Sequence, residues 1–141
     1  MKNFIDIESG RLLLDGGMVF FCGMGCDEIE RSDLVVTDRL NMKNGWVFWS
    51  SKNQKIEGIE INLALLFFCG NLRQIGFAFV DFSSGSSFDL KGLHDKFLMG
   101  KFGFPKINNE RMLSYAFDWG ELISEFDPRG GQANIVISWV K

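Results

Sequence analysis

Two alternating apolar runs in the middle of the chain constrain the fold most. Between residues 59 and 67 every second side chain is large and apolar, and the same alternation returns between residues 75 and 79, after Gly70-Asn71. A period of two is typical of a strand with one buried face. The apolar positions are Ile59, Ile61, Leu63, Leu65 and Phe67, then Ile75, Phe77 and Phe79. We therefore expect an antiparallel hairpin at the centre of a sheet.

Turn signals predict further hairpins on both sides of this centre. Asn44-Gly45 separates the β-prone segments 34–40 and 46–49, and Asn-Gly between such segments is a strong hairpin signal. Near the end, Asp127-Pro128-Arg129-Gly130 has the residues of a type I turn between the segments 119–126 and 132–141. The first residues, up to Cys22, are expected to form short strands or a hairpin.

Two helices are expected beside the strands. The series Asp27-Glu28-Ile29-Glu30 has the side chains of a capping box, with Asp27 at the cap, and predicts a short helix over 27–33. A main helix is expected over 89–102, after the polar loop 83–87. Its apolar stripe would be Leu90, Leu93 and Phe97, Asp89 would cap it, and Gly103 and Pro105 would end it. The prediction is a single α+β domain over 1–141, a mostly antiparallel sheet of about six to eight strands in a meander.

Charge and cysteine content narrow the class of protein. The chain of 141 residues has 18 acidic and 15 basic residues and a net charge of −3, without the basic stripe expected of a nucleic-acid-binding domain. Acidic residues interrupt the apolar start, and no stretch has membrane-spanning length without polar breaks, so neither a signal peptide nor a membrane segment is expected. Three cysteines without a pairing pattern favour a reducing compartment. We expect a soluble, cytoplasmic protein.

His94 is the only histidine, so any histidine-based catalysis would run through it. It lies beside the predicted apolar stripe, where a structural histidine or one that contacts a partner is the ordinary outcome. Cys22, Cys26, Cys69 and His94 could together ligate zinc, but their spacing is loose, and Cys69 at the end of an apolar strand is typical of a small buried side chain. Gly23-Met24-Gly25 begins like a dinucleotide fingerprint, which Glu28 then breaks. We expect no catalytic residue, no metal and no cofactor.

Acidic and aromatic side chains are the candidates for binding a protein partner. One acidic group is part of the predicted short helix, and a second lies on the last hairpin, where Glu121 and Glu125 share a strand face. Such groups are commonly solvated surfaces, and they can also dock a basic partner. Trp46 and Trp49 fall on opposite strand faces, so one of them could be an exposed interface anchor. The candidates are Asp27, Glu28, Glu30, Asp33, Trp46, Trp49, Glu121 and Glu125.

The last third of the chain resembles a family. Its features are Lys91-Gly92-Leu93-His94 in a helix, Gly103-Phe104-Pro105 at the helix end, Trp119-Gly120, Ser124, Phe126-Asp127-Pro128-Arg129 and the closing strand 135–139. These resemble small bacterial immunity proteins encoded beside polymorphic toxins, including those of contact-dependent growth inhibition.

The resemblance implies a bacterial cytoplasmic antitoxin that binds a cognate toxin C-terminal domain, often a nuclease. It implies no catalytic residues. From the charge and the absence of a membrane-spanning stretch, we expect direct contact with neither nucleic acid nor membrane. An acidic surface suits such a partner, because a nuclease that contacts phosphates is basic around its active site. Two alternatives stay open: a small hydrolase or nuclease that uses His94, and a domain that binds a small molecule or acts as a scaffold.

Overall fold

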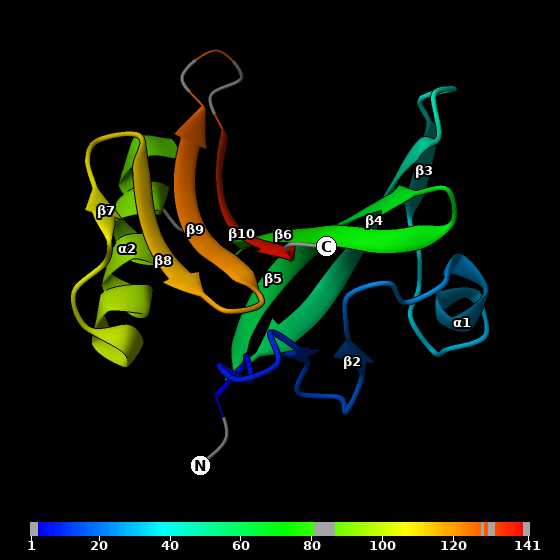
Figure 1. The fold of residues 1–141 in the computed structure, drawn as a ribbon, viewed down its shortest axis with the longest axis horizontal. Helices are drawn as coiled ribbons and strands as arrows, with labels where there is room; N and C mark the ends of the chain where they lie inside the picture. Colours follow the sequence, from blue (N-terminus) through cyan, green and yellow to red (C-terminus); the bar gives the residue numbers. More distant parts are fainter. Residues whose placement is uncertain (1–2, 81–86, 128, 130–131, 140–141) are drawn as a thin grey trace.

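The computed structural model describes residues 3–80, 87–127, 129 and 132–139. These residues form two helices and ten strands, arranged as an eight-stranded antiparallel sheet and a two-stranded sheet (Figure 1). In chain order the elements are β1 Leu12–Leu13, β2 Val19–Phe20, α1 Cys26–Glu30, β3 Asp38–Asn41, β4 Trp46–Ile56, β5 Ile59–Phe68, β6 Asn71–Phe79, α2 Ser87–Phe102, β7 Ile107–Asn108, β8 Met112–Phe117, β9 Gly120–Asp127 and β10 Gln132–Trp139. The predicted α+β class is confirmed.

The large sheet consists of two four-stranded meanders. Its spatial order is β3-β4-β5-β6-β10-β9-β8-β7, so each half follows chain order and the halves meet where β6 pairs with β10. Helix α2 connects the end of the first meander to the start of the second. The chain therefore departs from a single continuous meander at one place, the β6–β10 junction.

The central hairpin is confirmed, and so is the burial of the middle of its apolar face. Leu63 lies opposite Phe77 and Leu65 opposite Ile75 in the β5–β6 pair, and all four side chains are at most 2% exposed. The turn falls one residue earlier than predicted, at Cys69-Gly70, where both φ angles are positive, 52° and 86°. Cys69 is therefore an exposed turn residue, and the prediction that it is buried at a strand end was wrong.

The two outer hairpins are confirmed as well. Strands β3 and β4 pair around Asn44-Gly45, although β3 begins at residue 38. Strands β9 and β10 pair along their whole length. Pro128 and Gly130 of the predicted turn lie outside the described residues, but the Asp127 carboxylate accepts a hydrogen bond from the Arg129 N–H at 3.0 Å, as an Asp in that turn position does.

One face of the large sheet is the core face, and two coverings pack on it. Helix α2 lies against β6, β9 and β10, and the N-terminal segment adds Phe4, whose ring contacts those of Phe77, Phe97 and Phe102. The indole N–H of Trp139 donates to the Gly10 carbonyl oxygen at 2.8 Å. The N-terminal segment is thus held to the last strand of the chain.

Both helices differ from the predictions in detail. Helix α1 spans only five residues, and its N-cap is Gly25 without a side-chain hydrogen bond, so the assignment of Asp27 as the cap was wrong. Asp27 lies in the first turn of α1, where the positive end of the helix dipole stabilises a negatively charged carboxylate. Helix α2 begins at Ser87, which places Asp89 within its first turn and not at the cap. Residues 83–86 of the predicted polar loop lie outside the described residues.

The predicted apolar stripe of α2 is confirmed only in part: Phe97 packs on the core, but the most buried line of side chains is shifted by one residue. Leu93 is 40% exposed, whereas Lys91, His94 and Leu98 are at most 3% exposed. The buried line thus has the predicted i, i+3, i+7 spacing but is rotated by one position. Each of the two buried polar side chains has a polar partner in this arrangement. Asp95 pairs with Lys91 at 2.7 Å, and the Phe79 N–H donates to Nε2 of His94 at 3.2 Å. Nδ1 of His94 is buried without a hydrogen-bond partner.

Candidate functional site

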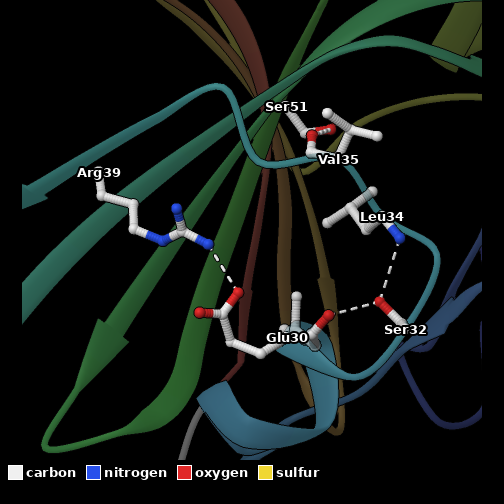
Figure 2. Close-up of polar contacts among 7 residues, drawn as sticks. Glu30, Ser32, Leu34, Val35, Arg39 and Ser51 are labelled. Atoms are coloured by element: carbon white, nitrogen blue, oxygen red, sulfur yellow. Dashed lines mark hydrogen bonds and ion pairs between the residues drawn. The ribbon is translucent and has the colours of Figure 1, made fainter.

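The predicted acidic group lies on and just after α1, at the β3 side of the sheet. Its four side chains, those of Asp27, Glu28, Glu30 and Asp33, are all exposed. Figure 2 shows how this group is joined to the sheet: the Arg39 guanidinium on β3 donates to the Glu30 carboxylate at 2.6 Å. Asp38 also lies on β3. We call the five carboxylates of Asp27, Glu28, Glu30, Asp33 and Asp38 the acidic edge.

Two serines hold the chain between α1 and β3. The Ser32 hydroxyl donates to the Ile29 carbonyl at 2.5 Å and accepts from the Leu34 N–H at 3.2 Å. The Ser51 hydroxyl donates to the Val35 carbonyl at 2.6 Å, so β4 fixes the extended segment before β3 (Figure 2). The acidic edge is therefore carried by an anchored backbone.

The two tryptophans lie on opposite faces of β4, as predicted. Trp49 is 6% exposed and packs on Phe67 in the core, at 4.8 Å between ring centroids. The guanidinium of Arg39 lies 4.8 Å from the Trp49 ring centroid, so the same arginine contacts the core and Glu30. Trp46 is half-buried on the other face, with its ring 4.8 Å from that of Phe68. Trp49 is thus a core residue, and Trp46 is the only one of this pair with substantial exposed surface.

The structure does not bring the last two predicted site residues to the acidic edge. Glu121 and Glu125 lie on β9, and β5, β6 and β10 separate β9 from β4 in the sheet. Strand β9 therefore lies four strand spacings, of about 4.8 Å each, from β4. Glu121 is exposed and Glu125 is half-buried. Burial, and secondarily the charge of Asp127, raises the pKa of Glu125 above its ordinary value.

Glu125 belongs to a hollowed surface that sequence reasoning missed. The face of the large sheet opposite the core carries three adjoining hollows of about 380, 210 and 520 Å³. The first two share Ala64, Gly76, Gln132 and Asn134, and the last two share Glu125. We call them together the sheet trough.

Apolar and amide side chains line the middle of the sheet trough. Small residues make its floor, since Ala64 lies opposite Gly76 in the β5–β6 pair. The other lining side chains are Phe48, Leu66, Gln74, Glu125, Gln132, Asn134 and Val136. The alternation of β5 places Ala64 on the face away from Leu63 and Leu65, and this signal could have revealed the small floor from sequence. The contribution of β10 could not be foreseen without the strand order.

Exposed apolar side chains form another feature that the predicted site lacked. Phe104, two residues after the end of α2, is 97% exposed, and near the acidic edge Val35 and Leu40 are 66% and 58% exposed. Large exposed apolar side chains are common at protein interfaces. The Gly103-Phe104-Pro105 sequence marked a helix end and carried no signal that its aromatic ring points into solvent.

His94 and the cysteines are placed apart from these surfaces. His94 is completely buried. Burial and the neighbouring Lys91 charge lower its pKa from 6.5 to about 4, against an opposing effect of Asp95. Its Nε2 accepts the Phe79 N–H, so the neutral imidazole stabilises the α2–β6 contact. Catalysis through His94 would need substrate access that this placement does not offer. In the described part of the chain, no three His, Cys, Asp or Glu side chains gather as a metal site would require.

No helix within the described ranges has the length and apolar character needed to cross a membrane. Comparisons with protein family models, with curated proteins and with solved structures found no match for this chain.

Proposed function

We propose that this protein is an immunity-type inhibitor that binds a cognate toxin domain stoichiometrically and blocks it. The observation that carries the proposal is the acidic edge, in which five carboxylates stand beside exposed apolar side chains on an anchored backbone. Such a surface suits a basic protein partner, because opposite charges accelerate encounter and apolar contacts hold the complex. A nuclease toxin has the required positive charge around its phosphate-binding site.

Further support comes from how the ionisable groups are placed. The single histidine stabilises the packing of α2 on β6, and the exposed carboxylates of the acidic edge face solvent. This arrangement favours occlusion of a partner over chemistry on a substrate. The resemblance of the last third of the chain to immunity proteins agrees with this proposal, which includes a cytoplasmic location.

The test is protection of cells by co-expression. The chain is produced together with the C-terminal domain of the protein encoded immediately upstream. We expect growth to be restored and the two proteins to co-purify as an equimolar complex. Continued toxicity together with failure to co-purify would contradict the proposal.

A His94→Gln variant separates inhibition from the alternative of a hydrolase. Glutamine retains a hydrogen-bond acceptor, and an inhibitor makes no chemical use of the imidazole. We expect the folded variant to protect cells as well as the unchanged protein does. Loss of protection by a folded His94→Gln protein that still binds the toxin domain would favour the hydrolase.

A further inference from the structure

Strand β3 ends the large sheet and pairs only with β4 among the described strands. The Met42 N–H, just after β3, donates to the Trp46 carbonyl at 3.0 Å. Because alternate residues of an antiparallel strand point their backbone groups to opposite sides, those of Arg39 and Asn41 are turned to the open side. An open strand edge is a template for pairing with another chain.

The two edges of the sheet differ in how well they could accept a strand. Strand β7 at the far edge has only two residues, and a very short edge strand gives little to pair with. Strand β3 has four, and the extended chain before it is fixed to β4. The Thr37 N–H donates to the Ser50 carbonyl at 2.7 Å, and the Ser51 hydroxyl donates to the Val35 carbonyl at 2.6 Å. A strand docking here would meet a backbone that is already ordered, which lowers the entropic cost of binding.

Exposed apolar side chains accompany this edge. Val35, Leu40 and Met42 are 66%, 58% and 40% exposed. Leu40 lies opposite Phe48 in the β3–β4 pair, on the sheet face that carries the trough. A strand added beside β3 would therefore cover Leu40 and extend the trough face.

Charge indicates which partner fits. Between Asp27 and Asn41 the chain has the five carboxylates of the acidic edge and only two guanidinium groups, those of Arg31 and Arg39. Arg39 is already paired with Glu30. A second copy of this chain would bring two acidic edges together, and like charges across an interface are unfavourable. A basic segment would meet complementary charge.

We propose that β3 accepts an extended, basic segment of the partner protein, which adds a strand to the sheet through the backbone groups of Arg39 and Asn41. Main-chain hydrogen bonds would supply affinity, and the acidic edge would select lysine or arginine side chains. Only the assignment of this segment to a toxin domain rests on the proposed function.

The first experiment needs no toxin. The ¹⁵N-labelled protein is titrated with a short peptide of alternating lysine and valine. We expect the amide signals of Arg39 and Asn41 to shift, and those of Ile107 and Asn108 on the far edge to stay in place. A peptide with glutamate in place of lysine, and a lysine peptide with N-methylated backbone, should each bind at least about tenfold more weakly. Absence of shifts at β3, or equal binding of all three peptides, would overturn the inference.

The second experiment uses the toxin domain. Proline at an edge position removes an outward N–H and leaves the bonds to the neighbouring strand in place. Asn41→Pro should weaken binding of the toxin domain about tenfold or more, whereas Asn41→Ala, which removes only the side chain, should bind nearly as the unchanged protein does. Hydrogen exchange at Arg39 and Asn41 in the unchanged protein should slow in the complex.

The outcomes separate the two proposals. If the toxin domain binds but Asn41→Pro binds equally well and exchange at β3 is unchanged, the edge is not the docking site and the inhibitor function stands. If the lysine peptide pairs with β3 but the toxin domain does not bind at all, the docking site stands and the toxin assignment fails. Self-association through β3 would overturn the choice of a basic partner.

Discussion

The imidazole of His94 has no exposed surface, and its chemistry is decided by what surrounds it. One nitrogen accepts the Phe79 N–H, and the ring packs edge-on against the Phe79 ring at 4.7 Å between centroids. Protonation would place a charge in this apolar contact, and the lowered pKa of about 4 reflects that cost. The sequence could identify His94 as the single histidine, but burial depends on the rotation of α2, which no local pattern fixed.

The low pKa of His94 predicts a stability loss in mild acid. The unfolded chain binds a proton at His94 below about pH 6.5, whereas the folded protein does so only below about pH 4. Stability from this group is therefore full above pH 6.5 and is lost as the pH falls toward 4. We expect the free energy of unfolding to drop by up to about 3 kcal/mol over this range. Chemical denaturation at several pH values measures it, and His94→Gln should make the dependence shallower; an unchanged slope would contradict the assignment.

At the scale of the element, α2 shows why pattern and packing can disagree. Leu90, Leu93 and Phe97 have helical spacing, yet Leu93 is 40% exposed and the fully buried side chains are those of Lys91, His94 and Leu98. Phe97 does pack on the core, with its ring 5.3 Å from that of Phe79. The apolar residues of α2 are spread around the helix, so no single stripe dominates, and the sheet selects the face. The helix boundaries were predictable to within two residues at the start and without error at the end, because Gly103 has a φ of +79° that ends the helix.

The buried ion pair on α2 gives a prediction for this element. Lys91 and Asp95 side chains are only 4% and 18% exposed. Lys91→Met leaves the Asp95 carboxylate without its cation and should destabilise the protein by about 3 kcal/mol. Lys91→Met combined with Asp95→Leu should lose less than the sum of the two single changes, because neither charge is then left alone. Thermal and urea unfolding of the unchanged protein, the two single variants and the double variant measures these losses as a double-mutant cycle.

The exposed pair Arg39–Glu30 is the matched control for that cycle. Its side chains are 48% and 51% exposed. Glu30→Gln should change stability by less than about 1 kcal/mol, since solvent screens the pair. Equal losses for both pairs would show that burial does not govern the α2 pair.

At the scale of the whole molecule, hairpins between neighbouring segments were predictable from the sequence, whereas pairings between distant segments were not. The hairpins at Asn44-Gly45 and at the central apolar runs were predictable, because neighbouring residues carry both the turn and the alternation. The β6–β10 junction joins Phe77 to Ile135, and the indole N–H of Trp119 donates to the Ile7 carbonyl oxygen at 2.9 Å. Such contacts between distant residues have no local signature. The acidic edge was predictable in part, since four of its five residues lie close together in the chain, between Asp27 and Asp33. Its fifth residue, Asp38, the open strand β3 and the sheet trough depend on strand order.

The contact between the N-terminal segment and the second meander predicts a graded series of glycine substitutions. Gly10 has a φ of +78°, and a Cβ there would lie 2.5 Å from Trp119. Gly10→Ala therefore combines backbone strain with a clash and should destabilise by more than about 3 kcal/mol. Gly17, with a φ of +102° and open space, should lose about 1 kcal/mol on change to Ala. Gly16 lacks both constraints and should stay within about 0.5 kcal/mol. Denaturant midpoints test the order, which an equal response at all three positions would contradict.

The junction between the two meanders also determines how late during synthesis the sheet can be completed. Strand β6 is complete at residue 79, but its partner β10 spans residues 132–139 and follows all the other strands in chain order. At about 5–20 residues per second, a ribosome needs several seconds to make the intervening chain. Throughout that interval the β6 edge, which includes Ile75 and Phe77, stands without its final neighbour. The chain is thus most exposed to pairing with a wrong strand during synthesis, when the first meander has been made and β10 has not.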